Sequence, residues 1–170
     1  MSDYHERSFM DQYPLSPRKP LKKTLTQFPF IAVFCIFLVH PAMMLLESKI
    51  SISSTGSILI TSAIFLIIVA LIYLYEQWYF RTYFYNLTDR LIIIRKGPIA
   101  SGEITISFDR IQDIYVDQDA LDRLFNIYDV HISTATAASG FRAHIDGVEK
   151  GTAERLRALF LKKVEESHNK

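Results

Sequence analysis

Residues 28–46 read FPFIAVFCIFLVHPAMMLL, and residues 58–75 read ILITSAIFLIIVALIYLY. Neither stretch contains Asp, Glu, Lys or Arg. At 1.5 Å per residue, a helix of either length spans a hydrocarbon core about 30 Å thick. The sequence therefore predicts a transmembrane helical hairpin over residues 28–80, whose two spans are joined by a short external loop at residues 47–57.

The distribution of basic residues predicts the orientation of this hairpin. Four basic residues precede the first span: Arg18, Lys19, Lys22 and Lys23. The loop has one base, Lys49, which Glu47 offsets, and further bases follow the second span. Positively charged flanks stay on the cytoplasmic side of a membrane. We therefore expect a multi-pass protein of the cytoplasmic membrane with both termini in the cytoplasm.

The segments outside the hairpin have different compositions. Residues 1–27 mix acidic, basic and aromatic side chains with three prolines, which is typical of a flexible arm, here cytoplasmic. Residues 81–166 alternate polar and apolar side chains and are expected to form a cytoplasmic domain, followed by a tail at residues 167–170. The basic residues near the membrane are expected to contact anionic lipid headgroups weakly, at about 1 kcal/mol per charge; they are Arg18, Lys19, Lys22, Lys23, Arg95 and Lys96.

The alternation within the domain predicts short antiparallel strands followed by one helix. Apolar residues alternate with polar ones most clearly at residues 101–108 and 111–118, which is the period of a half-buried strand. The other predicted strands are residues 82–86, 90–96, 128–134 and 141–145, the last ended by Asp146 and Gly147. A short helix at residues 119–125 has Asp119 as its N-cap and Asn126 as a left-handed C-cap. An amphipathic helix is predicted over residues 149–166. The fold class is thus α+β.

Three short motifs carry a family resemblance. They are Tyr85-x-Leu87-Thr88-Asp89, Arg110-Ile111-Gln112, and Asp129-Val130-x-Ile132-x-Thr134-Ala135. In this order, after an apolar hairpin, the chain over about residues 28–165 resembles bacterial membrane proteins with a pleckstrin-homology-like (PH-like) domain. The resemblance implies a bent antiparallel β-sandwich or barrel of about seven strands, capped by a C-terminal helix. It also implies that a larger relative with several such domains is a plausible partner.

The residue patterns predict no catalytic, cofactor-binding or metal site. The acidic residues between 109 and 122 lack the loop pattern of a calcium site, and they are interpreted as a solvated strand face and a helix cap. His131 and His144 are expected on different strands, without a third residue that would complete a zinc site. His40 precedes Pro41 inside the first span, where we expect a local helix distortion with His40 near the interface rather than a proton relay.

Charge and cysteine content narrow the function further. Residues 81–170 contain 13 basic and 13 acidic residues, and this balance argues against a nucleic-acid-binding surface. The single cysteine, Cys35, cannot form a disulfide within the chain. The sequence therefore predicts a non-enzymatic, membrane-anchored interaction or scaffold module, which binds a protein partner or another copy of itself. The alternatives are a weak anionic-lipid-binding module, or an accessory subunit of a membrane export or stress-resistance complex.

Overall fold

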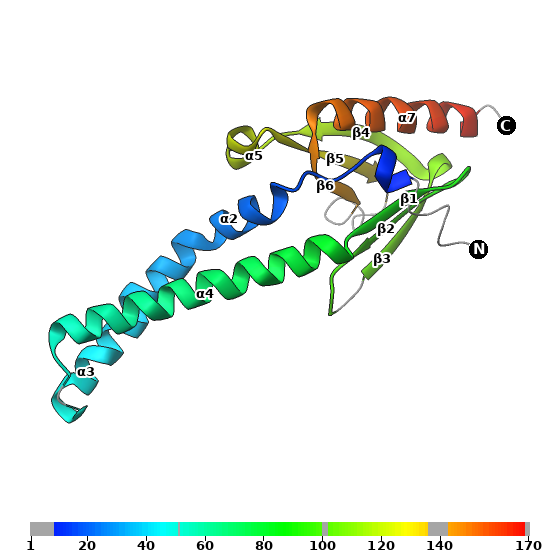
Figure 1. Cartoon of the computed structure of the whole chain (residues 1–170). Coiled ribbons are helices and arrows are strands. Elements are labelled where there is room, and N and C mark those ends of the chain that lie inside the picture. The colour runs from blue at the N-terminus through cyan, green and yellow to red at the C-terminus, as the bar shows by residue number, and fades with distance from the viewer. Residues whose placement is uncertain (1–8, 51, 100–101, 136–142, 169–170) are drawn as a thin grey trace. The chain divides into compact units, whose positions relative to one another are not determined.

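The computed structural model describes residues 9–50, 52–99, 102–135 and 143–168. The chain divides into two compact units, and Figure 1 traces it through both. Pro20–Trp78 is the helical unit. The described residues up to Lys19, together with those from Tyr79 onward, form the second unit, called the sheet domain here.

The helical unit is a hairpin of long apolar helices. Its first arm comprises α2 (Lys19–Phe34), a π-helical turn (Cys35–Val39) and α3 (His40–Ile50), and its second arm is α4 (Ser54–Thr82). An edge-to-face contact between Phe28 and Phe65, with ring centroids 5.1 Å apart, joins the two arms. Both helices extend beyond the predicted spans. Helical structure thus continues into both ends of the predicted loop at residues 47–57.

The π-helical turn ends two residues before the proline of the first span. The backbone N–H of His40 bonds to the carbonyl of Cys35, five residues earlier. Pro41 has no N–H to offer the carbonyl of Phe37, and a widened turn is one way in which a helix absorbs such a missing bond. The distortion predicted at this position is thus a π-helical turn.

Two three-stranded antiparallel sheets form the sheet domain. The first has the order β1 (Phe84–Leu87), β2 (Leu91–Lys96) and β3 (Gly102–Ser107). The second has the order β4 (Ile111–Asp117), β5 (Ile127–Thr134) and β6 (His144–Glu149). A short helix, α5 (Ala120–Phe125), joins β4 to β5, and α7 (Lys150–His168) ends the described chain (Figure 1). The α+β class is confirmed, with six strands among the described residues where the resemblance implied about seven.

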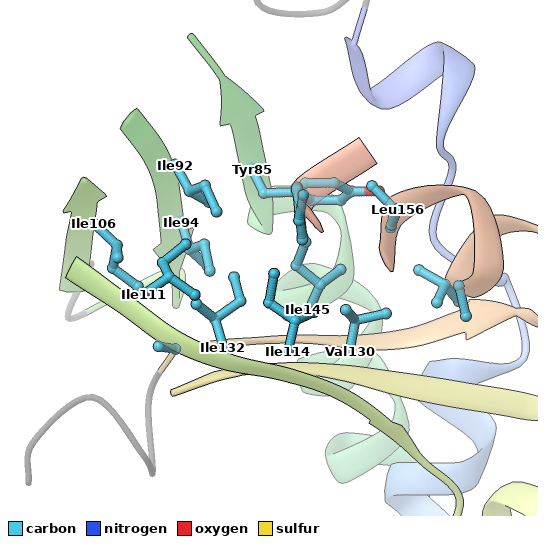
Figure 2. Close-up of a cluster of buried hydrophobic side chains, with 14 of the residues drawn as sticks. Tyr85, Ile92, Ile94, Ile106, Ile111, Ile114, Val130, Ile132, Ile145 and Leu156 are labelled. Carbon is cyan, nitrogen blue, oxygen red and sulfur yellow. The ribbon is translucent and has the colours of Figure 1, made fainter. Parts of the chain in front are cut away.

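The core lies between the two sheets and under α7. Figure 2 shows isoleucines of β2 and β3 pointing toward apolar side chains of β4, β5 and β6, with Tyr85 and Leu156 beside them. The alternation of the predicted strands explains this arrangement, because every second side chain of a strand faces the same way. On α7, Ala153, Leu156 and Phe160 recur at helical spacing and are buried.

The caps predicted for the short helix are confirmed. The Asp119 carboxylate accepts the N–H of Asp122 at 2.7 Å, and the Asp122 carboxylate accepts the N–H of Asp119 at 3.2 Å. This reciprocal pair satisfies two N–H groups that the helix itself leaves unbonded. At the other end, Asn126 has φ 53° and ψ 46°, the left-handed conformation. α5 is therefore fixed at both ends by local chemistry.

The prediction that Asp146 and Gly147 end the last strand was wrong. β6 runs through both residues to Glu149. Its register against β5 shifts, because Val148 pairs with Tyr128 whereas Ile145 pairs with Val130. One strand thus carries an extra residue, and Gly147 at φ 69° supplies the left-handed conformation that such a bulge needs. The predicted strand at residues 141–145 began in a segment outside the described residues.

The prediction of a flexible arm over residues 1–27 fails for its described part. Leu15 is buried in the core and forms an antiparallel bridge with Val148 of β6. The N–H of Ser16 donates to the carbonyl of Gly147 at 2.8 Å. The segment adds a short piece of backbone beside β6, which composition alone cannot reveal. From Lys19 onward the chain is already part of α2.

Candidate functional site

Two of the six predicted headgroup-binding residues meet at a buried aspartate. Lys19 Nζ lies 3.3 Å from Asp146 Oδ2, and Lys96 Nζ lies 3.5 Å from the same oxygen. The side chain of Lys19 is 3% exposed and that of Asp146 is 10% exposed. His144 Nε2 contacts the other carboxylate oxygen, Oδ1. We call Lys19, Tyr83, Lys96, His144 and Asp146 the Asp146 cluster.

The backbone explains how the members of this cluster come together. Lys19 begins α2, Lys96 ends β2, and Asp146 lies at the bulge of β6. A β-carbon placed on Gly147 would lie 2.9 Å from Cδ of Lys19. The stem of Lys19 therefore passes over a position where only glycine leaves enough room. Gly147 is therefore needed for two reasons: it adopts the left-handed conformation of the bulge, and it leaves room for the side chain of Lys19.

The aromatic ring of Tyr83 packs against Lys19 in the Asp146 cluster. Lys19 Nζ lies 3.9 Å from the centroid of the Tyr83 ring, within the range of a cation–π contact. The Tyr83 hydroxyl donates to the carbonyl of His144 at 3.0 Å. Burial, reinforced by the charge of Asp146, raises the pKa of Tyr83 well above its usual value. Tyr83 therefore stays neutral and acts as a hydrogen-bond donor.

Opposing effects act on the carboxyl of Asp146. Burial by itself would raise its pKa, but the ammonium of Lys19, the hydrogen bond from His144 and the charge of Lys96 together hold the pKa well below its usual value. Asp146 is thus ionised at neutral pH and compensated by its neighbours. Such a cluster suits the joining of chain segments rather than the capture of a phosphate group.

The remaining predicted headgroup residues are dispersed. Arg95 pairs with Glu103 on the surface at 2.7 Å, and Arg18 Nη1 donates to the carbonyl of Phe125 at 3.1 Å. Lys22 and Lys23 lie on α2, in the other unit. Headgroup contact by these residues stays a prediction. The sequence patterns missed Tyr83 and Asp146 as cluster members, because Asp146 was interpreted as the end of a strand and no local pattern links it to Lys19.

The family-motif positions mostly build the frame of the sheet domain. Tyr85 and Val130 are fully buried, Ile111 is 5% exposed, and Leu87 is partly buried against the core. Thr88 and Asp89 occupy the β1–β2 turn, where Thr88 exchanges hydrogen bonds with Leu91. Arg110 ends the 3₁₀ turn before β4, and Gln112 is exposed on β4. Asp129 accepts the N–H of Gly147 at 2.6 Å.

A groove runs between α7 and the second sheet. It encloses about 430 Å³. Its lining includes three charged residues, Lys150, Glu154 and Arg157; the other lining residues are Val116, Tyr128, Ala153, Ala158 and Leu161. Leu161 is 47% exposed and lies outside the buried core cluster to which α7 contributes Ala153, Leu156 and Phe160. The groove, which we call the α7 groove, was not predicted from the sequence.

Comparison with known proteins identifies one family. A family model described as "Bacterial PH domain" matches residues 26–164. The match extends over most of both units and includes every family-motif position predicted from the sequence. Neither the curated proteins nor the solved structures contain a significant match.

Proposed function

Because the chain belongs to the bacterial PH domain family, we propose that it is a membrane-anchored, non-catalytic module that presents its sheet domain to a protein partner. PH domains generally act as interaction modules. The observation that carries the proposal is the α7 groove, an apolar cleft with a partly exposed leucine on a domain that has its own closed core.

The composition and exposure of the two long helices support the membrane anchor. Lys19–Glu47 and Ser54–Thr82 are each 29 residues long, with mean hydropathy 2.3 and 2.7 in their most apolar windows. Only 11% and 6% of those windows are buried, whereas the core helix of a soluble protein is mostly buried. Within α4, the Thr61 hydroxyl donates to the carbonyl of Ser57 at 2.9 Å, so this polar group needs no water.

A cysteine-labelling experiment tests the anchor and its orientation. The only native cysteine is removed as Cys35→Ser, and single cysteines are introduced as Thr55→Cys in the first turn of α4 or Glu103→Cys in the sheet domain. With a membrane-impermeant maleimide on intact cells, we expect labelling at position 55 and protection at position 103. Labelling at position 103 in intact cells would contradict the cytoplasmic location of the domain.

Affinity purification of the full-length tagged protein in mild detergent tests the docking surface. We expect a stoichiometric protein partner or a defined oligomer, which the groove variant Leu161→Glu abolishes. The matched control is Leu124→Glu, because Leu124 is 70% exposed on α5 and lies outside the lining of the groove. A lone monomer in the wild type, or equal loss in both variants, would count against docking in the α7 groove.

The second candidate, weak binding of anionic lipid, rests on Arg18, Lys23 and Arg95, since Lys22 is only 7% exposed. The structure supports it less than the sequence did, because Lys19 and Lys96 lie against Asp146. Liposome flotation of the isolated sheet domain would first require evidence that this domain folds without the helical unit. The full chain is therefore better reconstituted in nanodiscs of neutral or anionic lipid. Amide hydrogen exchange around Arg95 is compared between the two kinds of nanodisc in the absence of a protein partner. Slower exchange in anionic nanodiscs, which added salt reverses, would favour this candidate.

A further inference from the structure

We propose that the outward face of strands β4 and β5 binds a divalent transition-metal ion through Asp117, Asp129 and His131. One possible ligand atom from each of these residues lies within 4.8 Å of the other two. This site lies outside the α7 groove and adjoins the Asp146 cluster at His144, whose ring stacks on that of His131. The sequence patterns had left His131 without further ligands, because the two carboxylates become its neighbours only through strand pairing.

The strand register places the three side chains on one face. Asp117 and Asp129 are directly paired across β4 and β5. His131 lies two residues beyond Asp129 on the same strand, so its side chain points to the same side of the sheet. His131 Nε2 lies 3.3 Å from Asp117 Oδ1. Two strands thus deliver two oxygen donors and one nitrogen donor to one place.

Stacking holds the imidazole of His131 in position. Its ring lies 4.8 Å from that of Tyr115, nearly parallel at 3°, and 5.2 Å from that of His144 on the other side. These three aromatic residues form a ladder across β4, β5 and β6. Asp129 is also oriented, because its Oδ1 accepts the N–H of Gly147 at 2.6 Å. Ligands held in this way by neighbouring groups bind metals more tightly than mobile side chains do.

Electrostatics favours a cation at this position. Like charges directly opposite each other in a sheet destabilise the pairing, and Asp117 and Asp129 are such a pair. A divalent ion between them would attract both carboxylates. The donor set also indicates the class of ion, since imidazole with carboxylates suits zinc and its transition-metal neighbours. Calcium would need six to eight oxygen donors. Asp117 is 58% exposed, so water can complete the coordination.

The simpler interpretation of the same geometry is an ion pair between His131 and Asp117 without any metal. The two interpretations predict different effects of added zinc on the stability of the domain. An ion pair needs no zinc, and zinc would leave the stability of the domain unchanged. A metal site links β4 to β5 through the ion, so zinc would raise the unfolding temperature in proportion to its occupancy.

The test is zinc titration of the full-length protein in detergent, by calorimetry and by thermal unfolding. We expect one zinc-dependent transition that Mg²⁺ does not reproduce. His131→Gln and Asp117→Asn should each weaken zinc binding by about tenfold or more, since each removes a ligand. The matched control is Asp113→Asn, an exposed aspartate of β4 that pairs with Ser133 instead of another acid. It should bind zinc like the wild type.

Three results would overturn the proposal. The first is that zinc leaves the unfolding of the wild type unchanged. The second is that all three variants bind zinc equally well, which would indicate an adventitious ion only. The third is that Asp113→Asn weakens zinc binding as much as the two ligand variants do. If His131→Gln fails to fold, Asp117→Asn still decides the question, because the Asp117 side chain is largely exposed and its loss leaves the core intact.

Discussion

At the scale of single residues, Asp146 brings together side chains from three distant segments of the chain. Its carboxylate faces Lys19, Lys96 and His144, and the first of these lysines is almost fully buried. Buried ion pairs contribute little net stability over an apolar replacement, but removing one partner leaves the other charge uncompensated. The Asp146 cluster is therefore sensitive to any substitution that alters one charge alone.

Asp146→Asn is expected to destabilise the sheet domain by about 3–5 kcal/mol, because the buried ammonium of Lys19 loses its counter-charge. The matched control is Glu103→Gln, which breaks the exposed pair with Arg95 and should cost less than about 1 kcal/mol. Denaturant unfolding in detergent, followed by amide hydrogen exchange of β6, measures both. Equal effects of the two substitutions would contradict the buried role of Asp146.

The lowered pKa of Asp146 also predicts a dependence of stability on pH. An unfolded aspartate has a pKa of about 3.9, above the folded value, so the unfolded chain binds the proton more readily. The contribution of Asp146 is therefore present above about pH 4 and is lost as the pH falls toward the folded pKa. The wild type should lose stability more steeply than Asp146→Asn in this acid range. Parallel pH profiles of the unfolding midpoint would refute the assignment.

At the scale of elements, α5 shows how local chemistry fixes a short helix. A helix of six residues forms too few internal hydrogen bonds to persist alone. Its capping box and the left-handed Asn126 supply what the helix lacks. The chain then turns directly into β5, which begins at Ile127. The cap therefore also sets where β5 starts.

Asn126→Ala is expected to destabilise the domain by about 1 kcal/mol, because alanine lacks the short polar side chain whose local hydrogen bonding lets asparagine tolerate φ 53°. Asn126→Gly should be neutral or slightly stabilising, since glycine adopts this conformation without strain. Thermal unfolding of the two variants beside the wild type provides the measurement. If alanine and glycine behaved alike, the left-handed cap would not matter for stability.

At the scale of the whole molecule, the sheet domain consists of two chain segments, one that precedes the helical unit in the sequence and one that follows it. Residues up to Lys19 precede the helical hairpin, and residues from Tyr79 follow it, yet both belong to one compact unit. Leu15 and Ser16 bond to β6 more than 130 positions later, at Val148 and Gly147. The described N-terminal segment is thus part of the domain core.

Leu15→Ala is expected to cost about 2–5 kcal/mol, as for a leucine in a packed core, because Leu15 is only 7% exposed. Leu124→Ala is the control and should stay within about 0.5 kcal/mol, since Leu124 is 70% exposed. Protease resistance of the sheet domain in the full-length protein reports both changes. Equal resistance of the two variants would show that the N-terminal segment does not stabilise the domain.

The sequence by itself determined the features that depend on neighbouring residues. Apolar length predicted the two long helices, alternation predicted most strands, and side-chain chemistry predicted the caps at Asp119 and Asn126. Each depends on interactions within a few residues, so a linear pattern contains the information. The motifs around Tyr85, Arg110 and Asp129 were enough to indicate the family.

Only the tertiary structure decided which distant residues meet. The pairing of Lys19 with Asp146, the opposition of Asp117 to Asp129, and the burial of Leu15 all depend on strand register and on the bulge at Gly147. A shift of one residue in register would turn every side chain of a strand to the opposite face. Register results from the packing of the whole core, and therefore no local pattern could predict the Asp146 cluster or the proposed metal site.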